Sequence, residues 1–173
     1  MPPIVRRIRA DEWPELRRLR LSALREAPLA FGSTYETEIA FDDATWRRWA
    51  ASGASGADEV LFAAALDGEF VAMARGSVSS EDARDAYLTA VFVAREWRGR
   101  GLGRAVSEAI IAWARERRCA RLLLHVTDWN EPARRIYESL GFVPTGTTEL
   151  LPHDPSVIEH EMAIPLNLPT GTA

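Results

Sequence analysis

The sequence predicts a mixed α/β fold whose central sheet is partly antiparallel. Two apolar stretches, residues 59–66 and 69–78, are separated by an Asp-Gly dipeptide, which is a strong signal for a β-hairpin. A third apolar stretch, residues 87–93, leads through a glycine-rich run into a long amphipathic helix, and residues 121–126 then have the composition of another buried strand. Because a helix connects these last two strands, we expect them to lie parallel in the same sheet.

One strand and two helices are expected before the hairpin. Residues 4–8 have the pattern of a strand, and Asp11 is a good N-cap for a helix over residues 12–27, which Pro28 ends. A second helical stretch is expected around residues 43–51. The apolar stripes of these helices would pack on the sheet.

Two less regular segments flank that second helix. Residues 31–38 are rich in aromatic and acidic side chains, and two interpretations stay open for them. The segment covers one end of the sheet, or it contacts a substrate through Phe31, Tyr35 and Glu36. Residues 52–57, with the sequence Ser-Gly-Ala-Ser-Gly-Ala, are expected to form a flexible turn or loop.

The remaining elements follow the strand at residues 121–126. Asn130 or Glu131 is expected to begin a helix, and Gly141 is expected to end it. Two closing strands are predicted at residues 142–147 and 157–166, with a proline-containing loop between them.

Length and composition bound the class of protein. The chain has 173 residues, so we assign residues 1–168 to one domain and 169–173 to a flexible tail. No apolar run approaches the roughly 18 residues of a membrane span, and the first residues lack a signal-peptide core, so we expect a cytoplasmic protein without membrane contact. A single cysteine, Cys119, excludes an internal disulfide framework, and no metal is implied. The net charge is −4 and no basic stripe is present, which argues against nucleic-acid binding.

The glycine-rich run between strand and helix has the composition of an anion-binding loop. It consists of Arg98, Gly99, Arg100, Gly101, Leu102 and Gly103. A helix start leaves backbone N–H groups free, and the positive end of the helix dipole adds to their attraction for phosphate. A nucleotide P-loop is excluded because the chain contains no lysine. The dinucleotide fingerprint is disfavoured because Arg104 stands where its third glycine belongs.

The pattern Arg98-x-x-Gly101-x-Gly103 resembles the cofactor loop of the GNAT family, the GCN5-related N-acetyltransferases. A second segment, Asn130-x-x-Ala133-x-x-x-Tyr137 followed by Gly-Phe, is similar to another motif of that family. The resemblance implies the GNAT fold, a mixed and mostly antiparallel sheet of about six or seven strands with a splayed parallel pair, flanked by about four helices. The chain departs from many members just before the loop, where it has Arg and Trp in place of Pro and Tyr.

The resemblance implies acetyl-CoA as cofactor, held in three places. The pantetheine arm would pair with the backbone of the strand before the loop, the diphosphate would take N–H groups of the loop, and Asn130 would bond the arm from the other side. The cofactor-binding residues implied in this way are Val91, Phe92, Val93, Arg98, Gly99, Arg100, Gly101, Leu102, Gly103, Arg104 and Asn130.

Tyr137 matches the family position that gives a proton to the departing thiolate, although its spacing also permits simple packing on a helix face. The oxyanion is expected to meet the N–H of Val91 or Phe92. The general base stays open: Glu36, Glu38, Asp85 and a water chain are all candidates.

The three histidines and the cysteine are interpreted as structural. His125 lies on a buried-strand pattern and is expected to be a satisfied core residue, as are His153 and His160 late in the chain. Cys119 has no visible activating partner, so no acetyl-cysteine intermediate is expected.

The expected activity is direct transfer of an acetyl group to a primary amine of a small molecule. Two alternatives stay open: an enzyme acting on protein N-termini or lysines, and a CoA-binding module without catalysis. The resemblance also leaves a homodimer open, because members of the family often dimerise.

Overall fold

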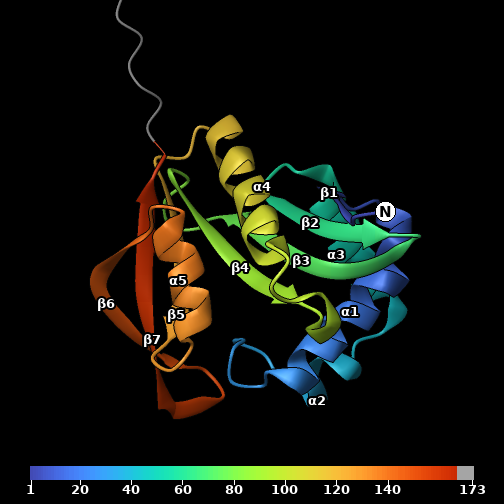
Figure 1. Cartoon of the computed structure of the whole chain (residues 1–173), viewed down its shortest axis with the longest axis horizontal. Coiled ribbons are helices and arrows are strands. Elements are labelled where there is room, and N and C mark those ends of the chain that lie inside the picture. Colours follow the sequence, from blue (N-terminus) through green and yellow to red (C-terminus); the bar gives the residue numbers. More distant parts are fainter. Residues whose placement is uncertain (167–173) are drawn as a thin grey trace, which may run out of the picture.

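The computed structural model describes residues 1–166, so the expected tail at 169–173 lies outside the described residues. One seven-stranded sheet has the order β1-β2-β3-β4-β5-β7-β6 (Figure 1). The strands are β1 (Ile4–Arg7), β2 (Glu59–Leu66), β3 (Glu69–Val78), β4 (Asp85–Val93), β5 (Arg121–Thr127), β6 (Val143–Leu151) and β7 (Asp154–Pro165). All neighbouring pairs are antiparallel except β4 and β5, so the predicted mixed sheet with one parallel pair is confirmed.

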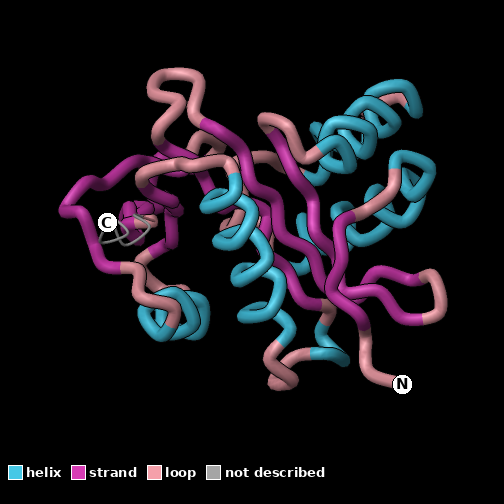
Figure 2. Tube along the Cα trace, turned by 90° about the horizontal axis from the view of Figure 1, so that it is seen from above, coloured by secondary structure: helices cyan, strands magenta, loops and turns pink. Residues whose placement is uncertain are grey.

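Helices cover both faces of the sheet. They are α1 (Trp13–Glu26), α2 (Tyr35–Ile39), α3 (Asp43–Ser55), α4 (Leu102–Glu116) and α5 (Glu131–Ser139), with short 3-10 turns η1 (Ala10–Glu12) and η2 (Arg95–Trp97). Figure 2 shows α4 and α5 on one side of the sheet and α1 and α3 on the other. None of the helices within residues 1–166 has the length and apolar character needed to cross a membrane.

The core is divided by the sheet into two apolar layers. Beneath α4 and α5 lie alternate residues of β5, Leu122, Leu124 and Val126, with the fully buried Trp113 of α4 beside them. Beneath α1 and α3 lies a second cluster that includes Phe92 of β4. Because side chains alternate along a strand, β2, β3 and β4 contribute to both layers.

The parallel pair separates after a short contact. β4 and β5 pair only at Asp85–Arg121 and the next two positions, ending at Tyr87–Leu123. Further along, β4 contains one more residue than the facing part of β3, and Ala90 within this bulge has a φ of 54°. A bulge bends its strand, and this one lies where β4 leaves β5. The rest of β4 therefore has one edge without a neighbouring strand.

The prediction of a loop over residues 52–57 is wrong, because α3 continues to Ser55. Gly53 is buried where α3 packs on β2: a Cβ added there would lie 2.6 Å from Cδ1 and 2.8 Å from Cβ of Leu61. Gly56 then ends the helix with a φ of 66°. The first glycine permits close packing and only the second marks the helix end, so the composition alone was misleading.

Three local predictions also differ from the structure. Asp11 does not cap α1, which begins at Trp13, and lies instead in η1, where the Glu12 carboxylate accepts the Arg9 N–H at 2.8 Å. The segment at residues 31–38 contains the short helix α2, which its sequence did not indicate. β6 and β7 extend further than expected, and only residues 152–153 connect them.

The close packing of α3 on β2 gives a stability prediction. Gly53→Ala should destabilise the protein by about 1–3 kcal/mol, because the added methyl overlaps Cβ and Cγ of Leu61 as well as its terminal Cδ1. This loss should appear in urea unfolding although alanine is the better helix former. Ala51→Gly, at an exposed position of α3, is the matched control and should lose about 1 kcal/mol through helix propensity alone. A Gly53→Ala protein more stable than the parent would contradict this account.

Candidate active site

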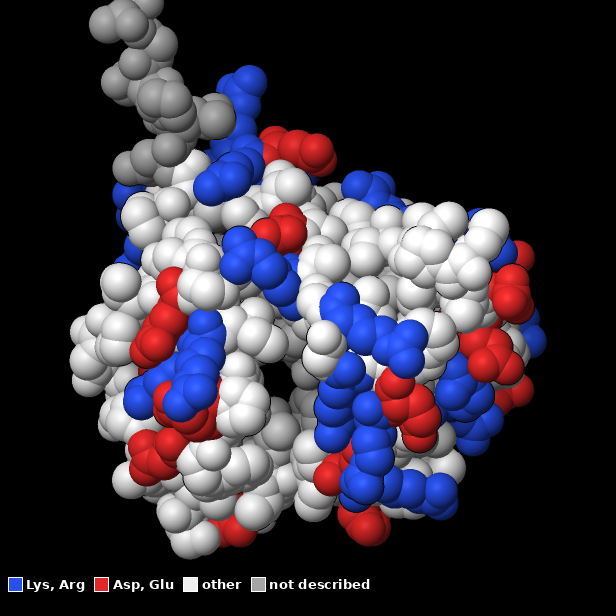
Figure 3. All heavy atoms as spheres, in the orientation of Figure 1, with Lys and Arg blue, Asp and Glu red and all other residues white. Residues whose placement is uncertain are grey.

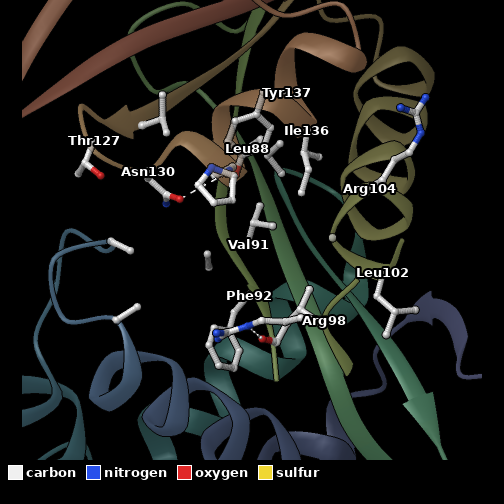
Figure 4. Close-up of a pocket in the computed structure, with 18 of the residues that line it drawn as sticks. Leu88, Val91, Phe92, Arg98, Leu102, Arg104, Thr127, Asn130, Ile136 and Tyr137 are labelled. Atoms are coloured by element: carbon white, nitrogen blue, oxygen red, sulfur yellow. Dashed lines mark hydrogen bonds between the residues drawn. The ribbon is translucent and has the colours of Figure 1, made fainter. Parts of the chain in front are cut away.

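The space between β4 and β5 is part of a cavity of about 740 Å³. Its wall is formed by the second half of β4, the glycine-rich loop, the first turn of α4 and the inner face of α5 (Figure 4). Of the residues expected to bind the cofactor, all except Arg100 line it. The cavity thus gathers two motifs that lie about 30 residues apart in the sequence.

The glycine-rich loop presents a row of free backbone donors. The N–H of Arg98 bonds the carbonyl of Arg95, and the N–H of Ala105 bonds the carbonyl of Gly101 at 3.0 Å. Within the described part of the chain, no N–H group between these two, at residues 99–104, has a hydrogen-bond acceptor. Gly101 precedes the first residue of α4 with a φ of 77°, a conformation that favours glycine. Free N–H groups at a helix start form an anion-binding site.

The arginines of the loop are mostly held by other groups. Arg98 donates from Nε to the Val93 carbonyl at 3.0 Å and from Nη2 to Glu26 at 2.8 Å, so a carboxylate offsets its charge. Arg100 lies over the Trp97 ring at 4.7 Å and does not reach the cavity wall. Basic side chains nevertheless gather beside a hollow on this face of the molecule (Figure 3).

Arg104 joins the two motifs across the cavity. It extends from the first turn of α4 and donates from Nη1 to the Ser139 hydroxyl at 2.9 Å and from Nε to Glu108 at 2.8 Å. Because Ser139 ends α5, this contact links the loop to the helix that carries Asn130 and Tyr137. This hydrogen bond holds the start of α4 close to the end of α5 beside the cavity.

The opposite wall of the cavity belongs to α5. Asn130 precedes the helix, and its Oδ1 accepts the Ala133 N–H at 3.4 Å. Its side chain lines the cavity at the start of α5 (Figure 4). Tyr137 is 8% exposed, contacts Phe142 edge-on at 5.9 Å between ring centroids, and lines the cavity. Tyr137 therefore packs on Phe142 and also reaches the cavity. Burial raises the pKa of Tyr137 well above the ordinary value near 10, so the phenol keeps its proton through the neutral range.

A second cavity, of about 380 Å³, adjoins the first on the α1 and α2 side of the sheet. Six residues line both: Ala30, Phe31, Leu88, Thr89, Ala90 and His125. Of the three residues expected to contact a substrate, Phe31 lines both cavities, whereas Tyr35 and Glu36 line neither. Tyr35 instead contacts Arg25, which donates to its hydroxyl.

The three carboxylates considered as general bases are not free in the cavities. Glu38 is 1% exposed and accepts from Nε of Arg20 at 2.8 Å and from Nη2 of Arg20 at 2.7 Å. Asp85 pairs with Arg121 at the far end of β4, and Glu36 lies on the surface. The structure instead places His125 on the wall of both cavities, where the sequence had indicated a core residue. Successive side chains of β5 point to opposite faces of the sheet, so His125 lies on the face opposite Leu124. This alternation in the sequence could have indicated that His125 does not belong to the layer beneath α4 and α5.

Known proteins resemble this chain in sequence and in fold. The profile of the acetyltransferase (GNAT) family matches residues 13–142. Streptothricin acetyltransferase of Streptomyces lavendulae is 32% identical over 120 residues, which is 68% of this chain and 62% of that protein. Thialysine N-epsilon-acetyltransferase of Bos taurus is 35% identical over 65 residues, or 38% of each chain. The chain thus spans less than two thirds of these curated relatives.

Solved structures extend the likeness over the whole fold. The structure of yncA from Salmonella typhimurium with its cofactor acetyl-CoA has a TM-score of 0.78 and 16% identity, and the match covers 99% of this chain and 98% of that one. Ribosomal-protein-alanine N-acetyltransferase of Brucella melitensis has a TM-score of 0.78 and 21% identity, covering 94% and 99%. At these identities the likeness concerns the fold.

Proposed function

Because the chain belongs to the GNAT family of acetyltransferases, we propose that it transfers an acetyl group from acetyl-CoA to a primary amine of a small molecule by direct transfer. The observation that carries the proposal is the row of free N–H groups at residues 99–104, next to the strand edge of β4 that β5 leaves unpaired. A diphosphate and an amide-containing arm need these two features side by side.

The loop and β4 would divide the binding of the cofactor between them. The diphosphate would accept from the free N–H groups at residues 99–104, and the end of α4 would add roughly 0.3–1 kcal/mol of charge interaction. The pantetheine amides would pair with the open edge of Val91, Phe92 and Val93, as a neighbouring strand does. Asn130 and Arg104 would complete the contact from the other side of the cavity.

The reacting groups follow from this placement. Bound acetyl-CoA supplies a thioester, whose C–S bond breaks as the acceptor nitrogen forms the new C–N bond. The N–H of Val91 or Phe92, beside the bulge, would stabilise the negative charge on the carbonyl oxygen. Tyr137 would donate its proton to the departing sulfur, and its raised pKa keeps that proton available at alkaline pH.

The second cavity supports a small acceptor. It is lined by Phe31 before α2, Phe41 between α2 and α3, and Trp49 of α3, together with the Arg20–Glu38 pair. A volume of about 380 Å³ suits a compact molecule and lies at the lower end of ordinary ligand sites. A peptide chain would need an open groove at this position.

The proposal is tested by incubating the protein with acetyl-CoA and a panel of amines while free thiol is measured. The panel should include thialysine and streptothricin, which the names of two relatives specify, together with simple diamines and a set of peptides. Thiol release with at least one small amine, and an acetylated product by mass spectrometry, is expected. Turnover of peptides alone would favour the protein-acetylating alternative, and tight acetyl-CoA binding without any transfer would favour a binding module.

Tyr137→Phe tests the proton donor. The variant keeps the ring that packs on Phe142, so we expect normal thermal stability and an unchanged KM for acetyl-CoA, with kcat lowered about 10²-fold or more. Tyr35→Phe, which removes a hydroxyl outside both cavities, is the matched control and should keep full kcat. Equal kcat values for parent and Tyr137→Phe at neutral and alkaline pH would remove Tyr137 from the mechanism.

Gly101→Ala tests the loop. Alanine in this left-handed conformation should cost about 1–2 kcal/mol of stability, and relaxation of the loop should weaken acetyl-CoA binding about tenfold in calorimetric titration. Gly68→Ala carries a similar strain, with a φ of 87° in the β2–β3 turn, and has equally open surroundings. It should lose stability but bind acetyl-CoA normally. The same affinity in both variants would contradict the role given to residues 99–104.

A further inference from the structure

His125 occupies the boundary between the two cavities. If the proposed function holds, acetyl transfer takes place at this boundary, because the cofactor fills one cavity and the acceptor fills the other. Among the six described residues that line both, His125 alone has a side chain with a basic nitrogen. The position of this imidazole is therefore the position that a base for the acceptor amine must have.

The strand β5 fixes the imidazole in that place. Its register sets His125 opposite Glu161 of β7, while Leu124 and Val126 point to the other face, beneath α4 and α5. The Tyr87 ring of β4 lies nearly parallel to the imidazole, with 6.1 Å between centroids and 16° between planes. Nε2 of His125 is buried and has no hydrogen-bond partner in the described residues, so the protein itself does not use its hydrogen-bonding capacity.

Carboxylates surround this nitrogen from two strands. Nε2 lies 3.6 Å from Glu149 of β6 and 3.8 Å from Glu161 of β7, which is within reach of an ionic interaction but outside a hydrogen bond. Glu159 of β7 lines the second cavity, and burial raises its pKa. Burial, followed by the charge of Glu161, also raises the pKa of Tyr87, so that ring stays neutral beside the imidazole.

Both arginines that line the second cavity form ion pairs with glutamates. Arg75 of β3 and Arg20 of α1 line it, but Arg75 pairs with Glu59 and Arg20 pairs with Glu38. The carboxylates near His125 therefore give this wall a net attraction for a cation. Within residues 1–166, no three His, Cys, Asp or Glu side chains converge as ligands of one metal ion, so the arrangement fits an organic cation better than a metal.

We propose that the acceptor is a protonated amine drawn by Glu149, Glu159 and Glu161, and that His125 removes its proton. The N–H bond of the ammonium breaks and the proton moves to the imidazole of His125, which leaves the nitrogen lone pair of the amine free to form the C–N bond with the acetyl carbon. The imidazolium is stabilised by Glu149 and Glu161 and returns its proton to solvent after the product leaves. The departing sulfur takes its proton from Tyr137, on the other side of the sheet.

His125→Gln tests this assignment, with an amine from the panel that the parent protein acetylates. We expect kcat/KM for the amine to fall about 10²-fold or more at pH 7, with the KM for acetyl-CoA unchanged. The loss should shrink as the pH approaches the pKa of the amine, near 10, because the free amine then needs no base. Glu161→Gln should raise the KM for the amine more than it lowers kcat.

His160→Gln is the matched control. His160 lies on β7, contacts Asp128 and lines neither cavity, so its replacement should leave the whole pH profile unchanged. A His125→Gln protein within threefold of the parent at pH 7, or one whose loss is the same at every pH, would overturn the proposal. The second result would indicate a structural role.

A measurement on the unaltered protein separates this inference from the proposed function. Imidazole signals are followed by NMR while an amine that the protein acetylates is added to the complex with CoA, which permits binding without transfer. The His125 signals should shift while those of His160 stay in place. If no amine of the panel is turned over, the proposed function fails. If an amine is turned over but leaves the His125 signals unchanged, the proposed function stands and the present inference is overturned.

Discussion

The whole site depends on the early end of pairing between β4 and β5. After three paired positions the two strands diverge, and the bulge at Ala90 bends β4 away from its neighbour. An unpaired strand edge inside a protein leaves N–H and C=O groups without partners, which costs free energy unless a ligand or water satisfies them. The same divergence makes the cavity and exposes the backbone that would hold the cofactor. A sheet paired along its full length would have neither.

In the proposed cofactor site, the attraction for an anion would come from the backbone more than from side chains. Arg98 is partly neutralised by Glu26, Arg100 lies on Trp97, and Arg104 is held by Glu108 and Ser139, so none of them is a free cation in the cavity. The N–H groups at residues 99–104 have no competing acceptor in the described chain. This explains how a chain with a net charge of −4 can present an anion site, since oriented dipoles act at short range whatever the net charge.

Local patterns allowed much of the fold and the cofactor side of the site to be predicted. The hairpin, the strand before the loop and the helix after it each have strong signals over a few residues, and the confirmed sheet follows from their order. Predictions were wrong where a residue serves packing at a distance, as Gly53 does against Leu61. The place of His125 on the cavity wall was not predicted for the same reason. His125 meets Glu149 and Glu161 only through the register of β5, β7 and β6, and no local pattern determines that register.

The two faces of the sheet also separate the two proton transfers that acetylation of an ammonium requires. Tyr137 belongs to the apolar layer beneath α4 and α5, where burial keeps its phenol protonated, and His125 lies on the opposite face among carboxylates that favour a cation. In the proposed mechanism, the proton that leaves the amine and the proton that reaches the sulfur would therefore follow separate routes on the two sides of the divergent strands. Both side chains line the cavity between these strands, where Tyr137 would act on the departing sulfur and His125 on the acceptor nitrogen.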